Sequence, residues 1–172
     1  MNIENALKVQ GWMDEHDLRW LAEQASRHSR IVEVGCWRGR STTVLADNTP
    51  GTVWAIDHWR GSEEHQPVDA DRLYQMFLDQ MASYIDSGKV IPMRTTSHDA
   101  AAKWLGATFD MIFIDASHDY ESIKADILAW KPLVAPGGLF CGHDAGHPPI
   151  MRALAELLPE SHNENSMWVV TL

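Results

Sequence analysis

The chain has 172 residues, of which 45% are hydrophobic and 22% are charged, values close to the averages of globular domains. This length predicts a single domain over residues 1–172, with a helical lead-in over 1–29 and a core over 30–172. The formal net charge of −10 disfavours nucleic acids and anionic membranes as partners, because both are bound by clustered Lys and Arg.

The two cysteines, Cys36 and Cys141, show no motif spacing. We therefore expect reduced thiols in a cytoplasmic protein. No apolar run approaches the length of about 18 residues that a membrane span needs. The first five residues, Met-Asn-Ile-Glu-Asn, show no signal-peptide pattern, so we expect no secretory leader.

Short apolar runs alternate with amphipathic stretches along the chain. They predict helices over 14–28, 41–46, 71–86, 99–105, 120–134 and 148–158, and strands over 30–34, 52–56, 89–93, 109–114, 139–141 and 167–171. A polar loop is expected over residues 58–70. Alternating strands and helices predict an α/β fold, with a Rossmann-like, doubly wound and mostly parallel sheet that has helices on both faces. We expect six to seven strands, because little chain follows the last helix.

Acidic residues fall near the ends of several predicted strands. Glu33 lies near the end of the first strand, and Asp57, Asp115 and Asp144 come just after later ones. In such sheets, ligands bind beyond the carboxyl ends of the strands, where the strand order reverses. The pattern therefore predicts a ligand site at this edge.

Residues 31–41 read Ile-Val-Glu-Val-Gly-Cys-Trp-Arg-Gly-Arg-Ser. Gly35 permits a tight turn beside a ligand, Gly39 lets the next helix approach, and Ser41 can cap that helix. The spacing is neither the G-x-G-x-x-G of dinucleotide binders nor a Walker loop, so it disfavours NAD and FAD. An ordinary strand–helix turn is the alternative.

Asp57 follows Gly35 by 22 residues, at the end of the next predicted strand. An acid at this place can accept hydrogen bonds from both hydroxyls of a ribose. The alternative is a helix cap or a solvated loop acid. The loop and the acid together are more specific than either alone.

The run Val-Glu-Val-Gly-Cys-Trp-Arg-Gly-Arg-Ser, followed by Trp-Ala-Ile-Asp-His-Trp, resembles class I S-adenosylmethionine (SAM)-dependent methyltransferases. Later segments resemble their small metal-assisted O-methyltransferases of the macrocin and mycinamicin type. These segments are Phe-Ile-Asp-Ala-Ser-His-Asp-Tyr, Asp126, Trp130-Lys-Pro-Leu, Pro136-Gly-Gly and Gly142-His-Asp144. The similarity covers roughly residues 28–145.

The resemblance implies that SAM is the cofactor. Its methionine end would lie at the glycine loop, its ribose at Asp57 and its adenine at the turn Thr96-Ser97-His98. Trp37 and Trp59 would pack against the adenine or the sulfonium, or else only against other surface residues. The residues that the resemblance implies for cofactor binding are Glu33, Gly35, Trp37, Gly39, Ser41, Asp57, His58, Trp59, Ser97, His98 and Asp115.

Asp115 and Asp144 close predicted strands that are neighbours in the usual strand order, about 4.8 Å apart. Like charges about 4 Å apart repel by roughly 4 kcal/mol at an effective dielectric constant near 20. Either one pKa rises or a hard cation such as Mg²⁺ binds. The resemblance implies a divalent metal at Asp115 and Asp144, with His143 beside them. A third ligand stays open because Ala145 stands where catechol-type relatives have Asn, and helix capping is the alternative role of the acids.

His118 comes three residues after Asp115. A neutral imidazole there can take the proton of a substrate hydroxyl, and in the resembling enzymes this histidine is the proposed base. The alternative is a histidine that only hydrogen-bonds the Asp115 loop.

The expected function is O-methylation of a small hydroxylated acceptor, such as a sugar, with divalent-metal assistance. Two alternatives stay open. One is a catalytically reduced module or accessory subunit that binds SAM or S-adenosylhomocysteine (SAH), and the other is a small oxidoreductase, which the glycine spacing disfavours. Because no acceptor pocket is recognisable, we expect an open site, or one completed by residues 58–88 or by another subunit of a homo-oligomer.

Overall fold

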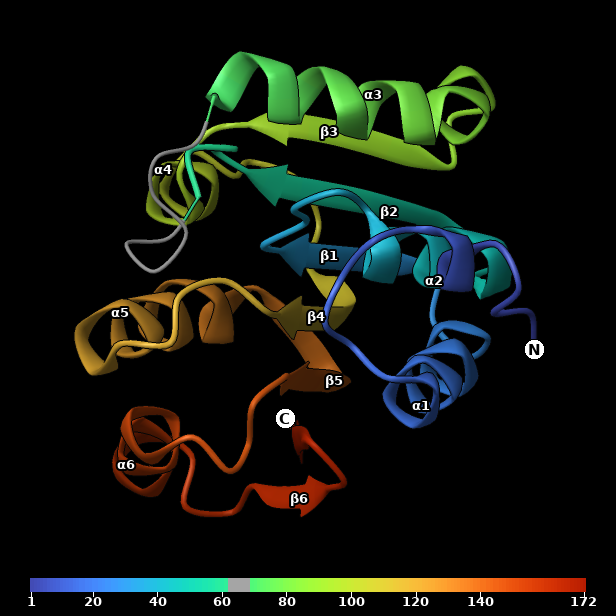
Figure 1. Ribbon diagram of the computed structural model, residues 1–172. Coiled ribbons are helices and arrows are strands. Elements are labelled where there is room, and N and C mark those ends of the chain that lie inside the picture. Colours follow the sequence, from blue (N-terminus) through green and yellow to red (C-terminus); the bar gives the residue numbers. More distant parts are fainter. Residues whose placement is uncertain (62–68) are drawn as a thin grey trace.

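The computed structural model describes residues 1–61 and 69–172, which form one seven-stranded sheet in the order β3-β2-β1-β4-β5-β7-β6 (Figure 1). Strands β1 to β5 are parallel, whereas β7 runs antiparallel to β5 and β6 antiparallel to β7. The strands are β1 (Arg30–Val34), β2 (Thr52–Asp57), β3 (Val90–Arg94), β4 (Phe109–Ile114), β5 (Val134–Gly142), β6 (His162–Glu164) and β7 (Met167–Thr171). This confirms the predicted fold class.

Each face of the sheet is covered by helices (Figure 1). One layer contains α1 (Glu15–Ala25), α2 (Arg40–Asn48) and α3 (Ala70–Asp86), and the other contains α4 (Ser97–Ala102), α5 (Tyr120–Trp130) and α6 (Pro148–Leu157). Side chains alternate between the two faces of a strand. In β1, for example, Ile31 packs in the first layer and Val32 in the second.

Most predicted elements are present with small shifts at their ends. The predicted helix over 120–134 ends at Trp130 and continues as the 3-10 turn η3 (Lys131–Leu133), because Pro132 has no N–H for the α-helical pattern. Strand β6 was not predicted, since its three residues are all exposed and show no apolar alternation. The predicted polar loop over 58–70 lies in part outside the described residues.

The lead-in contains the short 3-10 helix η1 (Ala6–Lys8) and then α1. Asp14 accepts hydrogen bonds from the backbone N–H groups of His16 and Asp17 and so caps α1. Within residues 1–61 and 69–172, no helix combines the length and the apolar character that crossing a membrane requires.

Candidate active site

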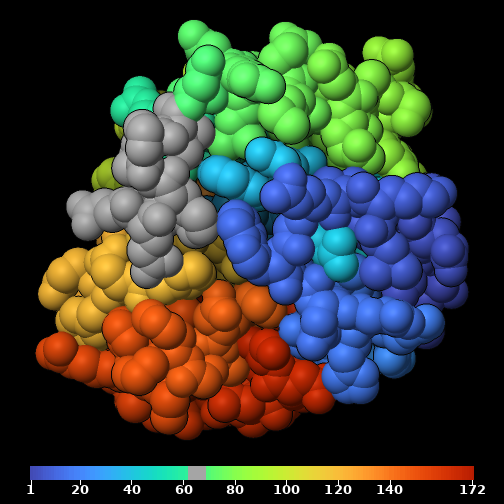
Figure 2. All heavy atoms as spheres, in the orientation of Figure 1, coloured from blue at the N-terminus to red at the C-terminus, as the bar shows by residue number. Residues whose placement is uncertain are grey.

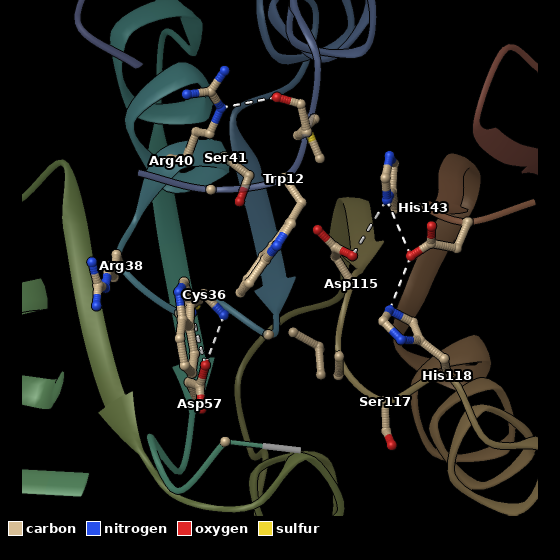
Figure 3. A pocket seen from close by; sticks show the side chains of 18 of the residues that line it. Trp12, Cys36, Arg38, Arg40, Ser41, Asp57, Asp115, Ser117, His118 and His143 are labelled. Atoms are coloured by element: carbon tan, nitrogen blue, oxygen red, sulfur yellow. Dashed lines mark hydrogen bonds and ion pairs between the residues drawn. The ribbon is translucent and has the colours of Figure 1, made fainter. Parts of the chain in front are cut away.

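A cavity of about 680 Å³ opens at the carboxyl ends of β1, β2, β4 and β5 (Figure 3). Its size is within the usual range of small-molecule sites, about 300–1,000 Å³. The strand order reverses between β1 and β4, which is where doubly wound sheets bind their ligands. The acidic residues that follow the strands therefore meet here, as the sequence predicted.

The β1–α2 loop forms one wall of the cavity and touches the β4 loop. Gly35 has a φ angle of +91°, and a Cβ atom on it would lie 2.1 Å from the carbonyl oxygen of Asp115. Any side chain would thus collide with backbone. The position requires glycine because two loops meet at this point.

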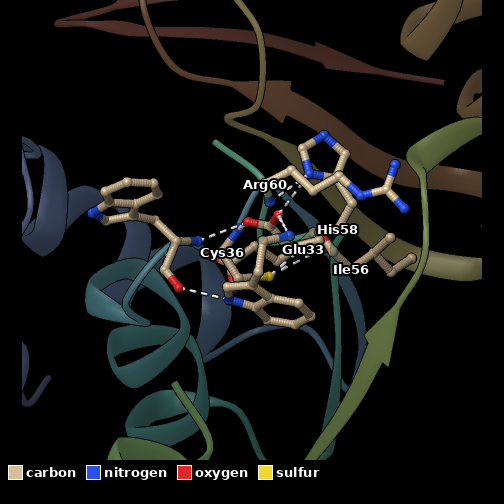
Figure 4. A network of polar contacts seen from close by, with 8 residues as sticks. Glu33, Cys36, Ile56, His58 and Arg60 are labelled. Carbon is tan, nitrogen blue, oxygen red and sulfur yellow. Dashed lines mark hydrogen bonds and ion pairs between the residues drawn. The ribbon is translucent and has the colours of Figure 1, made fainter. Parts of the chain in front are cut away.

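Asp57 holds this loop in place from the end of β2. Its Oδ2 accepts hydrogen bonds from the backbone N–H groups of Cys36 and Trp37, both at 2.9 Å, and its Oδ1 accepts one from Trp59 at 2.6 Å. Trp37 has a φ angle of 48°, a conformation that bulky side chains rarely adopt. These contacts stabilise that strained backbone. Figure 4 shows the surrounding network, with Cys36, Ile56 and His58 gathered at the ends of β1 and β2.

Most of the residues predicted to bind the cofactor line the cavity. They are Gly35, Trp37, Ser41, Asp57, His58, Ser97 and Asp115. The structure thus brings together residues from four separate segments, those that follow β1, β2, β3 and β4. Four other predicted residues, Glu33, Gly39, Trp59 and His98, are not among those that line it.

Glu33 lies behind the cavity wall rather than at its surface. It is fully buried, and its carboxylate accepts hydrogen bonds from the hydroxyls of Ser41 and Thr42. Burial raises the pKa of Glu33 to about 7, although both hydroxyl hydrogen bonds oppose the rise. The side chain thus supports Ser41, which does face the cavity.

The prediction that Trp59 contacts the cofactor from the rim needs correction. The side chain is fully buried, with its ring centroid 4.5 Å from that of Tyr74 and 4.8 Å from that of Phe77. Its Nε1 donates to the carbonyl oxygen of Trp37 at 2.8 Å. Trp59 therefore packs α3 against the glycine loop.

Gly39 and His98 also lie outside the lining of the cavity. A Cβ atom on Gly39 would lie 3.0 Å from Met81 and 3.3 Å from Phe77, so this glycine admits the side chains of α3 and does not touch the cavity. His98 is exposed, because α4 turns it away, while the preceding Ser97 faces the cavity.

Opposite the glycine loop, the imidazole of His143 lies among the carboxylates of Asp17, Asp115 and Asp144. Figure 3 shows His143 facing Asp115. Nδ1 of His143 lies 3.2 Å from Asp144 Oδ2 and 3.7 Å from Asp115 Oδ1, and its Nε2 lies 3.2 Å from Asp17 Oδ2. Burial alone would lower the pKa of His143, but the hydrogen bond to Asp144 and the charges of Asp115 and Asp144 raise it to about 9. The resulting imidazolium relieves much of the repulsion that the acid pair would otherwise suffer.

The pKa values of Asp115 and Asp144 shift in opposite directions in these surroundings. The hydrogen bonds from His118 and His143 hold the pKa of Asp144 well below its usual range. Burial raises the pKa of Asp115, although the charge of His143 opposes the rise. Unequal pKa values of this kind are common at catalytic sites.

His118 faces the same acids, with its Nε2 3.0 Å from Asp144 Oδ2. Asp115, His118 and Asp144 each offer one ligand atom, and these three atoms lie within 4.8 Å of one another. Two carboxylates and an imidazole can hold a divalent cation. His143, which was expected at the metal, is not part of this cluster, and its two nitrogens face three carboxylate oxygens.

The residues that precede α1 form a further wall that sequence reasoning missed. The cavity is also lined by Gln10, Gly11, Trp12 and Met13. The Trp12 ring packs against the Trp37 ring, tilted by 46° and with centroids 5.5 Å apart. Figure 2 shows the N-terminal residues, in dark blue, at the surface beside the light blue β1–α2 loop. The one available signal was Trp12, a large apolar residue outside any predicted element.

Comparisons with known proteins agree with this architecture. The crystal structure of an O-methyltransferase from Bacillus cereus in complex with SAH superposes with a TM-score of 0.70, at 16% identity, over 99% of this chain and 90% of that one. The O-methyltransferase TomG from Streptomyces achromogenes, solved with SAM, gives a TM-score of 0.69 at 15% identity, over 93% of this chain and 81% of that one. The fold is that of SAM-dependent methyltransferases.

Residues 32–145 match the methyltransferase domain family. The chain therefore belongs to this family. The uncharacterized protein y4gI of Sinorhizobium fredii is 28% identical over 130 residues, which cover 73% of this chain. The match covers 14% of y4gI, so the chain spans a small part of that relative's length.

Proposed function

We propose that this chain transfers a methyl group from SAM to a hydroxyl group of a small acceptor, such as a sugar. The observation that supports this most strongly is the shared cavity. Asp57, the acid placed to bind a ribose, lines one side of the cavity. His118, a base paired with the carboxylate of Asp144, lines the opposite side. A protein that only bound SAM would not need the second pair.

The glycine loop and Asp57 provide the cofactor side of this proposal. Gly35 leaves room beside the backbone of Asp115. Asp57 Oδ2 already accepts two backbone N–H groups, whereas Oδ1 accepts one, so Oδ1 keeps a lone pair for a ribose hydroxyl. When bound, SAM supplies a methyl group attached to a sulfonium. The sulfur leaves as a neutral thioether, so no general acid is needed to protonate it.

His118 and Asp144 provide the acceptor side. A neutral imidazole of His118 takes the proton as the acceptor's O–H bond breaks, and Asp144 stabilises the imidazolium that forms. In the same displacement the oxygen gains the methyl group and the sulfur loses it, so the products are a methyl ether and SAH. Asp115 and Asp144 would hold a divalent cation, which when bound would supply a positive charge that lowers the pKa of the acceptor hydroxyl.

The test is transfer of isotope-labelled methyl from SAM to a panel of hydroxylated sugars and phenols, with chelator-treated protein and with or without Mg²⁺. We expect His118→Ala to lower turnover by about 10²-fold or more and to leave SAM affinity unchanged. Equal turnover would remove His118 as the base. If SAM binds but no acceptor is methylated, the SAM-binding module becomes the better account.

The divalent cation is tested separately by titrating Mg²⁺ into chelator-treated wild type and Asp144→Asn. The proposal predicts a saturable heat that the substitution abolishes, together with Mg²⁺-dependent turnover. Full turnover in chelator would contradict metal assistance and leave the imidazolium of His143 as the charge at the acid pair.

A further inference from the structure

Asp17 is a buried acid to which the proposed reaction gives no role. It lies in the first turn of α1, is 3% exposed, and its Oδ2 lies 3.2 Å from Nε2 of His143. Among the described residues, its second oxygen, Oδ1, is buried and has no hydrogen-bond partner. A buried carboxylate oxygen without a partner lowers the stability of a fold. Stability alone therefore does not explain an acid at this position.

The imidazole of His143 connects Asp17 to the proposed base. One ring nitrogen, Nε2, faces Asp17, and the other, Nδ1, lies 3.2 Å from Asp144 Oδ2. The same oxygen of Asp144 lies 3.0 Å from Nε2 of His118. A continuous series of contacts thus runs from α1 through His143 and Asp144 to His118.

The two contacts of the His143 ring determine how the ring lies. A carboxylate only accepts hydrogen bonds, so the ring donates from Nε2 to Asp17 and from Nδ1 to Asp144. Without Asp17, the buried Nε2 would lose its acceptor. The ring could then turn until Nε2 reaches another acceptor, and Nδ1 would move away from Asp144.

Asp144 is the member of this series that most needs support. Its φ angle is 58°, in the left-handed region that residues with a side chain rarely adopt. Such a backbone persists where surrounding contacts hold it. His118 and His143 both contact its carboxylate, but His118 must exchange a proton with the acceptor in the proposed reaction. His143 is therefore the constant support of Asp144, and Asp17 is the support of His143.

We propose that Asp17 is a positioning residue for methyl transfer, which fixes His143 so that Asp144 stays where it can orient His118. The inference rests on the proposed function, because His118 is the base of that reaction. A base is effective only within hydrogen-bond reach of the proton and in the right direction, so a small displacement of Asp144 lowers turnover. Helix α1 thus supports the reaction although its residues, Glu15–Ala25, are not among those that line the cavity.

A purely structural role, in which Asp17 only fastens α1 to the residue after β5, predicts a different result. Loss of the contact would then lower stability and leave the kcat of the folded protein unchanged. Trp20→Phe is the matched control on the same helix. Trp20 Nε1 donates to Glu164 at 2.5 Å, so this variant removes a polar contact of α1 with β6 and leaves Asp17 in place. It should lower thermal stability and keep the wild-type kcat.

The experiment measures kcat with the labelled-methyl assay and SAM affinity by calorimetric titration. We expect Asp17→Ala to lower kcat by about tenfold or more and to leave SAM affinity unchanged, because Asp17 is not among the residues that line the cavity. Asp17→Asn keeps an acceptor oxygen for Nε2 of His143 and should recover most of the kcat. If Asp17→Ala does not unfold cooperatively, Asp17→Val, which is nearer to Asp in volume, takes its place.

A double-mutant cycle tests whether Asp17 acts through His143. His143→Ala should itself lower kcat, and in that background Asp17→Ala should cause no further loss, because the side chain that it supports is gone. A wild-type kcat in Asp17→Ala, or an equal loss in both backgrounds, would overturn the inference and leave the proposed function intact. If wild type methylates no acceptor of the panel, the inference falls together with the proposed function.

Discussion

Asp57 combines a structural role with its proposed ligand role. The carboxylate accepts hydrogen bonds from three backbone N–H groups of the segment that it holds, those of Cys36, Trp37 and Trp59. Because Trp37 has a positive φ angle, removal of the carboxylate also removes the contacts that hold a strained backbone. Its substitution should therefore affect both binding and folding.

We expect Asp57→Ala to weaken SAM binding by about 1–3 kcal/mol, through loss of charge-assisted hydrogen bonds, and to lower the thermal stability of the free protein. Asp57→Asn keeps one acceptor oxygen, so it should keep more stability than Asp57→Ala. Calorimetric titration and thermal unfolding measure the two effects. Unchanged SAM affinity in both variants would exclude Asp57 from the ligand site.

The raised pKa of Glu33 makes the free energy of unfolding depend on pH, and its direction fixes the sign of that dependence. The folded protein holds the Glu33 proton up to about pH 7, whereas the unfolded chain releases it near its ordinary pKa of about 4.3. The stabilisation that Glu33 adds by holding its proton in the folded state is therefore complete below about pH 4.3 and is lost as the pH rises through 7.

Glu33→Gln removes this titration while it keeps an acceptor oxygen for one of the two hydroxyls, Ser41 and Thr42, and offers an N–H donor to the other. Between pH 4.5 and 8, wild type should lose about 3 kcal/mol of unfolding free energy relative to Glu33→Gln, from a pKa shift of roughly 2 to 3 units. Denaturant unfolding across this pH range measures the difference. A difference between the two proteins that does not change with pH would show that folding does not raise the pKa of Glu33.

At the scale of elements, the N-terminal segment shows how a stretch without regular structure becomes part of the site. Nε of Arg40 donates to the carbonyl oxygen of Met13 at 2.9 Å, and Nη1 donates to those of Val9 at 2.7 Å and Ala6 at 3.4 Å. A Cβ atom on Gly11 would lie 2.7 Å from the Arg40 side chain. The first residue of α2 thus holds the lead-in over the cavity.

We expect Arg40→Ala to destabilise the fold by about 1–3 kcal/mol, because several carbonyl groups lose a charged donor, and to increase amide hydrogen exchange over residues 6–13. Arg38→Ala is the matched control in the neighbouring loop, since Arg38 donates a hydrogen bond to the side chain of Gln10. Equal exchange in wild type and Arg40→Ala would show that other contacts hold the segment.

Sequence patterns predicted the elements with a strong apolar period and missed those without one. Strand β4 is almost entirely apolar and was placed with its observed bounds, whereas the exposed β6 has no such pattern. The role of the N-terminal segment could not be predicted, because it depends on Arg40 contacts made across more than 25 residues. Likewise, Trp59 is buried because it packs against Phe77 of α3, and the sequence around Trp59 does not reveal this contact.

At the scale of the whole molecule, the site is formed by residues that the chain order separates and the strand order brings together. Asp57 is the last residue of β2, Asp115 follows β4 and Asp144 follows β5. All three line one cavity at the reversal between β1 and β4. Their positions were predicted because parallel strands share one carboxyl edge. His143 was also expected beside Asp115 and Asp144, but its contact with Asp17 was not, since Asp17 reaches it from α1.

The most direct test of the account is calorimetric titration of chelator-treated protein with SAM, with and without Mg²⁺. The account predicts saturable binding of one SAM per chain with a Kd in the micromolar range, and weaker binding in Asp57→Ala. Absence of SAM binding in both buffers, by protein that unfolds cooperatively on heating, would contradict it and would mean that the methyltransferase fold here serves another ligand.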